Sequence, residues 1–150
     1  MRSKDIFKQL FPGMIVGFIL GFVINFVAGV DTVNPVPNMI GIVLSCTVPV
    51  TLNGIIILMG TAKHLDRKLS IGEAFKRNLG YIFLGTVIGL FYMVGMLNSG
   101  VELTQVNEMT NTITNALLGV VVSTLLGYFT IKEYAEDVKY TRRDKIFIYK

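Results

Sequence analysis

The sequence predicts an all-α integral membrane protein, and two observations support this fold class. Four apolar stretches lie at residues 11–30, 39–62, 80–98 and 110–131. Each is close to the roughly 20 residues that a helix needs to cross a bilayer. All fourteen Lys and Arg residues lie outside these stretches, in three short segments: before the first, between the second and third, and after the fourth. Because short cytoplasmic loops are enriched in Lys and Arg, the pattern predicts four transmembrane helices with both termini in the cytoplasm.

The composition predicts one transmembrane domain that covers residues 1–150. A chain of this length with 52% hydrophobic residues suits a single compact unit. A water-soluble four-helix bundle would instead show a polar stripe along each helix. The stretch 11–30 contains one Asn and no charged residue around its whole circumference, which excludes such a stripe.

The N-terminal segment 1–10 mixes apolar and basic residues at the spacing of a short amphipathic helix at the membrane interface. Pro12 then suits the first turn of a separate transmembrane helix, where its missing N–H costs nothing. The apolar run that follows is longer than the 7–15 residues of a signal-peptide core. We therefore expect a retained helix.

Three local signals organise the rest of the chain. Two prolines predict a tight outer turn within residues 31–37, and Pro49 interrupts the second helix. Ser70-x-x-Glu73 fits a capping box, so an inner-loop helix should start there and can run into the third transmembrane helix. The fourth helix is expected to extend past the membrane into a cytoplasmic tail, residues 132–150.

Small residues recur every four positions in each apolar stretch. Residues four apart share a helix face, and small side chains let helices approach closely in a bilayer. The rows predict either a tightly packed bundle or oligomer interface, or the lining of a narrow polar path. The candidate packing positions are Gly13, Gly17, Gly21, Gly41, Gly85, Gly89, Gly119, Ser123 and Gly127, and the rows also include Gly29, Asn111 and Asn115.

Asn25 and Asn53 interrupt two of these rows with amides. An unpaired amide in hydrocarbon costs several kcal/mol, so each must face protein or water. Pro49 should free a backbone carbonyl near Ser45, close to two threonine hydroxyls, and broken helices of this kind bind ions in transporters. The candidate polar path or ion contact is Asn25, Ser45, Thr47, Thr51 and Asn53. Pairing of the amides with each other or with backbone is the alternative.

Several functional classes lack support. No charged residue lies in the central part of any apolar stretch, which excludes a buried carboxylate relay. The only cysteine, Cys46, and the only histidine, His64, lie at different expected depths, so we predict no enzyme, metal site or cofactor. The net charge of +4 is explained by the membrane-flanking segments, without a nucleic-acid partner.

We therefore expect a small multi-pass protein of the cell membrane, in contact with the lipid bilayer. No sequon or lipidation motif occurs, so a bacterial inner membrane is the default location. We expect it to act as a channel or transport component, and since four helices are too few to enclose a wide path, that component would be a homo-oligomer. The alternative is an accessory subunit that binds, stabilises or regulates another membrane protein.

Overall fold

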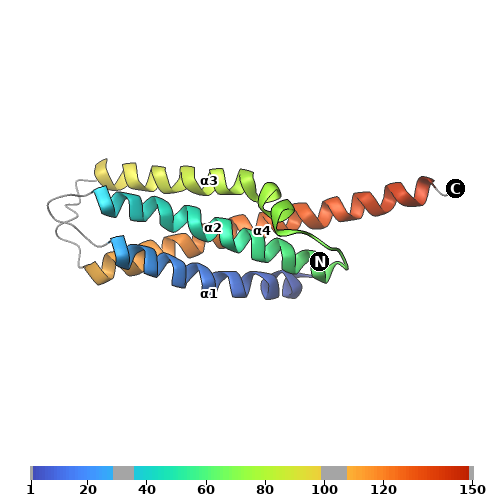
Figure 1. The fold of residues 1–150 in the computed structure, drawn as a ribbon, viewed down its shortest axis with the longest axis horizontal. Helices are drawn as coiled ribbons and strands as arrows, with labels where there is room; N and C mark the ends of the chain where they lie inside the picture. The colour runs from blue at the N-terminus through green and yellow to red at the C-terminus, as the bar shows by residue number, and fades with distance from the viewer. Residues whose placement is uncertain (1, 29–35, 99–107, 149–150) are drawn as a thin grey trace.

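The computed structural model of the chain describes residues 2–28, 36–98 and 108–148, with the side chains of residues 36–38, 97, 108, 111 and 142–148 excepted. The described residues form four helices joined by loops (Figure 1). They are α1 (Ser3–Ala28), α2 (Val36–His64), α3 (Ile71–Asn98) and α4 (Glu108–Ile148). Each contains a segment long and apolar enough to cross a membrane, which confirms the predicted helical class and indicates a membrane protein.

The first helix differs from the prediction of a separate amphipathic segment. Residues 3–10 are the first turns of α1, and Pro12 lies inside the helix. These turns are held by packing: Leu10 is buried against Ile57 of α2 and Ile131 of α4. The contact stabilises a continuous helix although Pro12 removes one backbone hydrogen bond.

The predicted capping box at the start of α3 is confirmed. The Ser70 N–H donates to Glu73 Oε2 at 3.0 Å, and the Glu73 N–H donates to Ser70 Oγ at 3.3 Å. The backbone hydrogen bond from Ser70 is the main cause that holds the pKa of the Glu73 carboxyl below its usual value. The predicted inner-loop helix is therefore the first part of α3, ahead of its apolar segment.

A Schellman motif ends α2 in front of this cap. Asp66 has a positive φ of 55°, a conformation that Asp tolerates better than most residues. Its N–H donates to the Lys63 carbonyl, and the Arg67 N–H donates to the Ala62 carbonyl at 2.8 Å, which is the hydrogen-bond pattern of this motif. The two motifs fix both ends of the connection between α2 and α3.

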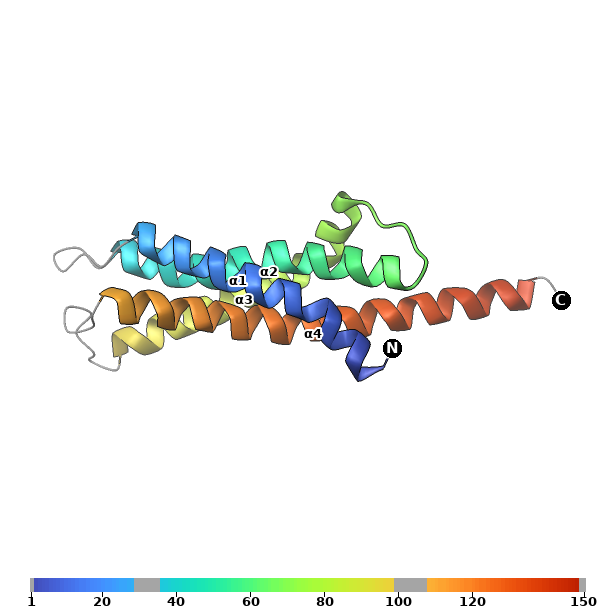
Figure 2. The same ribbon diagram turned by 90° about the horizontal axis from the view of Figure 1, so that it is seen from below.

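Helices that are consecutive in the sequence are not always neighbours in the bundle. α2 packs against all three other helices, and α1 and α4 also pack against each other, whereas α3 and α4 make few contacts. Figure 2 shows α1 crossing the bundle obliquely. α3 is therefore attached to the bundle mainly through α2.

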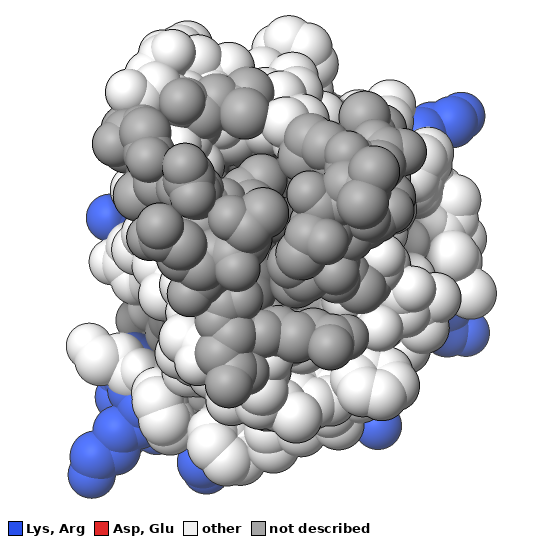
Figure 3. Space-filling model, turned by 90° about the vertical axis from the view of Figure 1, so that its left-hand side faces the viewer, with Lys and Arg blue, Asp and Glu red and all other residues white. Residues whose placement is uncertain are grey.

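The described charged side chains gather at one end of the molecule, called here the basic end. It comprises the N-terminus of α1, the connection 65–70, the first turns of α3 and the part of α4 that extends beyond the bundle (Figure 1). From the opposite end, the described surface is uncharged apart from basic side chains at its periphery (Figure 3). The charge asymmetry of the sequence is thus an asymmetry of the folded molecule.

Candidate functional site

Asn25 of α1 lies at the centre of a hydrogen-bonded cluster between three helices. Its amide nitrogen donates to the Ser45 hydroxyl of α2 and, at 2.8 Å, to the carbonyl of Gly21. Its amide oxygen accepts a hydrogen bond of 2.9 Å from Asn115 Nδ2 of α4. Ser45 donates to the Gly41 carbonyl at 2.7 Å. The three side chains are at most 3% exposed, so the cluster joins α1, α2 and α4 in the interior.

A second polar contact lies nearer the basic end. Asn53 Nδ2 of α2 donates to Ser123 Oγ of α4 at 3.2 Å. Asn53 follows Ser45 by eight residues, which separates the two contacts by about 12 Å along α2 at 1.5 Å per residue. Asn53 Oδ1 is buried and accepts no hydrogen bond from the described residues. An unsatisfied buried acceptor of this kind costs about 1–3 kcal/mol.

The glycine rows lie in the interior and bring the helices together. A β-carbon at any of the eight glycines of the candidate packing set would come within 3.3 Å of an atom on a neighbouring helix. At Gly17 that atom is the Asn53 amide nitrogen, and at Gly21 it is the Ala116 backbone. The glycines therefore allow the approach on which the amide contacts depend. Gly29 and the side chain of Asn111 lie outside the described residues.

Pro49 has a specific neighbour on α4. Because proline lacks an N–H, the carbonyl of Ser45 has no i+4 donor within α2. Gly119 faces this carbonyl so closely that a β-carbon would overlap its oxygen. The freed carbonyl is therefore covered by the backbone of α4.

Thr47 and Thr51 do not join the Ser45 carbonyl. Their hydroxyls donate to the carbonyls of Val43 and Thr47, at 3.0 and 2.8 Å. The Thr47 hydroxyl also lies 2.9 Å from the hydroxyl of Thr86 on α3. The structure thus divides the candidate path: Asn25 and Ser45 meet each other, Asn53 meets Ser123, and Thr47 faces a different helix.

Asn78 of α3 belongs to the same polar interior but was not among the predicted site residues. Its Nδ2 donates to the Val50 carbonyl of α2 at 2.9 Å, and its Oδ1 is buried with no partner among the described residues. Gly54 makes room for it, since a β-carbon there would overlap the Asn78 amide. A signal was present in the sequence, because Asn78 lies seven residues before Gly85 and therefore on the same helix face as the glycine row of α3.

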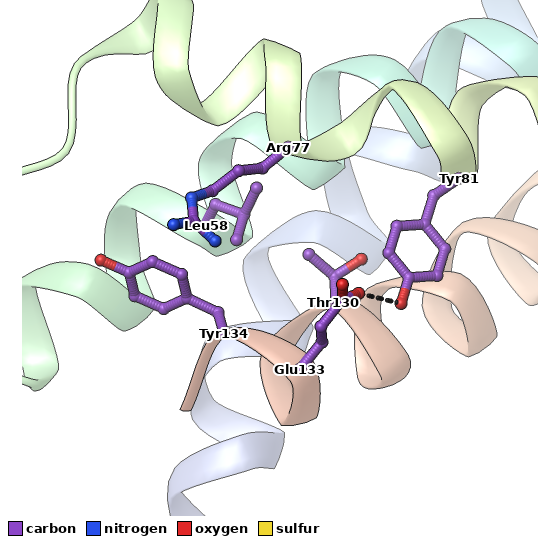
Figure 4. Close-up of a pocket in the computed structure, with 6 residues that line it drawn as sticks. All are labelled: Leu58, Arg77, Tyr81, Thr130, Glu133 and Tyr134. Carbon is purple, nitrogen blue, oxygen red and sulfur yellow. Dashed lines mark hydrogen bonds between the residues drawn. The ribbon is translucent and has the colours of Figure 1, made fainter. Parts of the chain in front are cut away.

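A small cavity lies between α3 and α4 at the basic end, with a volume of about 100 Å³ (Figure 4). The Tyr81 hydroxyl donates to Glu133 Oε2 at 2.7 Å across this gap. The Arg77 guanidinium forms a 2.8 Å ion pair with Asp137 and lies over the Tyr134 ring, 5.3 Å from its centroid. These polar contacts bridge two helices that make few contacts with each other. The cavity is also lined by Leu58 and Thr130.

The described residues contain no group of three His, Cys, Asp or Glu side chains that could hold a metal ion. Cys46 is buried in an apolar cluster with Val50, Val122 and Leu126. What the described polar interior can do chemically is hold three helices in one register through directional hydrogen bonds.

Comparison with protein-family models, with curated proteins and with solved structures gives no match for this chain.

Proposed function

We propose that this chain is an accessory membrane subunit that associates along α3 with a second membrane protein. The proposal includes four bilayer crossings, with the basic end in the cytoplasm and a bacterial inner membrane as the location. The gathering of basic side chains at one end of the molecule supports this orientation.

The interior gives an accessory role more support than a conduit within one chain. Asn25, Ser45 and Asn53 are buried and bonded to other helices. Groups that line a transport path need access to water or to the substrate, whereas these groups form hydrogen bonds with buried side chains of other helices. Their arrangement favours a role in helix packing.

The observation that carries the proposal is the outward face of α3. In the most apolar segment of α3 only 11% of the residues are buried, against 50% in that of α2. Phe83 and Phe91 on α3 are 72% and 75% exposed. Gly80 and Gly95 also lie on this helix, where an added β-carbon would meet nothing within 4 Å. Small residues outside the bundle do nothing for internal packing, but they let another transmembrane helix approach closely.

Photo-crosslinking in native membranes tests this role. A crosslinking amino acid at Phe83 or Phe91 should give an adduct of one discrete mass with a different protein. The matched controls are Val121 and Leu125 on α4, which are 55% and 58% exposed and should give lipid adducts alone. Equal protein adducts from both helices, or none from α3, would refute the proposal.

An oligomeric channel or transport component remains the second candidate, and one observation favours it. The side-chain oxygens of Asn53 and Asn78 are buried without a hydrogen-bond donor among the described residues. Side-chain amide oxygens are ligands for hard cations. Adducts of twice the chain mass from α3 would show that two copies of this chain associate there, which would favour this role. Reconstituted vesicles should then show ion flux that Asn53→Leu abolishes while the assembled particle stays intact.

A further inference from the structure

A second pocket lies beside the cavity of Figure 4, at the surface of the basic end. Its volume is about 250 Å³, and the connection 65–70, the first turns of α3 and the extension of α4 form its walls. Arg77 and Tyr134 line both hollows and therefore stand between them. The volume is below the roughly 300–1,000 Å³ of sites for drug-sized molecules, which suits a smaller group.

The pocket lining has three cationic and two anionic side chains, and two of the cations form no ion pair with the described residues. Its charged lining is Arg67, Lys68, Arg77, Glu73 and Asp137. Asp137 is already engaged by Arg77, and Glu73 accepts two hydrogen bonds from Ser70 as part of the helix cap. Among the described side chains, neither Arg67 nor Lys68 forms an ion pair.

Arg67 is held in place by the end of α2. Its N–H closes the Schellman motif with Ala62, and its side chain is half-buried. A guanidinium presents a fixed fork of donors that matches a phosphate group, and Lys68 adds a neighbouring point charge. The lining is thus suited to a phosphate.

The pocket also has an apolar part, which favours a lipid over a soluble phosphate. Leu69 and Val138 line it, and both pack against the apolar cluster that includes Leu58 and Tyr134. The pocket lining therefore combines apolar and cationic residues, at the level where α2 ends and the apolar segment of α3 has not yet begun. Phospholipid headgroups lie at this level of a bilayer, and basic pockets there bind anionic headgroups.

We propose that this pocket binds the phosphate of an anionic phospholipid, with Arg67 and Lys68 as its principal ligands and Arg77 as a third donor. The site is independent of the accessory role and requires only that the basic end lie at the membrane surface. The bound lipid would cover the gap between the first turns of α3 and the extension of α4.

Native mass spectrometry of the full chain in a zwitterionic detergent tests the site. With added phosphatidylglycerol, the chain should retain one lipid that phosphatidylcholine does not replace. Arg67→Gln combined with Lys68→Gln should weaken this retention about tenfold or more, the scale expected when charge-assisted hydrogen bonds to a phosphate are lost. Lys76→Gln combined with Lys139→Gln removes the same charge from exposed positions outside the pocket and should leave retention unchanged.

Three outcomes would overturn the proposal. Equal loss in both double variants would mean that net charge attracts the lipid without a site. Equal retention of phosphatidylcholine would exclude recognition of an anionic headgroup. Binding of inorganic phosphate at millimolar concentration, with the strength of phosphatidylglycerol and the same dependence on Arg67, would assign the pocket to a soluble anion. The single substitution Arg67→Lys should retain only part of the binding, since it keeps the charge but loses the fork of donors.

Discussion

Asn115 on α4 donates a hydrogen bond of 2.9 Å to Asn25 on α1, across 90 positions of sequence. The amide nitrogen of Asn25 also donates a hydrogen bond to the Ser45 hydroxyl of α2. One amide therefore links three helices and fixes their relative rotation and depth. Apolar packing alone specifies this register weakly in a bilayer, because lipid tails are as apolar as the side chains that they would replace.

The first prediction concerns the coupling between these two amides. Asn25→Ala and Asn115→Ala should each destabilise the folded protein, and a double-mutant cycle should give an interaction free energy of about 0.6–2 kcal/mol, the range measured for hydrogen bonds between membrane helices. The measurement is unfolding in mixed micelles, followed by circular dichroism. Val23→Ala and Leu117→Ala change exposed positions on the same two helices and should be additive. Additivity in the Asn25–Asn115 cycle would show that the bond contributes nothing to stability.

The second prediction compares two glycines. Gly119→Ala forces a methyl group into the Ser45 carbonyl and should destabilise the protein by about 1–3 kcal/mol, the usual cost of overpacking. Gly80→Ala adds the same group where nothing lies within 4 Å, and it should be neutral or stabilise α3 by up to about 1 kcal/mol, through helix propensity. Thermal unfolding of the purified chain measures both. A Gly119→Ala protein as stable as the Gly80→Ala protein would contradict the close approach of α2 and α4.

The third prediction concerns pH and the start of α3. The hydrogen bond from the Ser70 N–H lowers the pKa of Glu73 in the folded protein, so the contribution of the cap to stability is present above the pKa of an unfolded glutamate. It is lost as the pH falls through the lower, folded value. The Ser70 amide resonance in NMR spectra should shift with this titration, and Glu73→Gln should remove the shift. A midpoint above the ordinary glutamate pKa would have the wrong sign for this cap.

The fourth prediction tests the orientation. With Cys46 replaced, cysteines at Thr32 and Thr104 should react with an impermeant thiol reagent added to intact cells. Cysteines at Ser70 and Thr141, on the basic end, should react only after the membrane is opened. Labelling at Ser70 in intact cells would reverse the orientation.

The helices were predictable because length and polarity decide them. Each apolar stretch lies inside an observed helix, apart from residues 29 and 30, which are outside the described residues, and Ser70-x-x-Glu73 marked the start of α3 from two residues alone. The first turns of α1 were misassigned to a separate helix because Pro12 suggested a start. Tertiary packing of Leu10 against two other helices overrode that local signal.

The partners of the polar groups were not predictable, since they depend on which helices become neighbours. A period of four places Asn25, Ser45 and Asn115 on helix faces, but it does not say that α4 packs against α1 while α3 lies outside. Asn78 was missed because it adjoins Arg77 and precedes the apolar segment that the sequence outlines. Tyr81 and Glu133 are 52 positions apart, and neither belongs to a recognisable motif.

The central position of α2 has a consequence for the order in which the chain enters the membrane. Synthesis delivers α1 and α2 first, and the contact between Asn25 and Ser45 is complete within that hairpin. α3 can then bind to the free side of α2, while the α1–α2 surface that receives α4 stays open. The last helix, α4, has Asn115, Gly119 and Ser123 on one face. This face packs against α1 and α2, the two helices that were synthesised first, and completes the bundle.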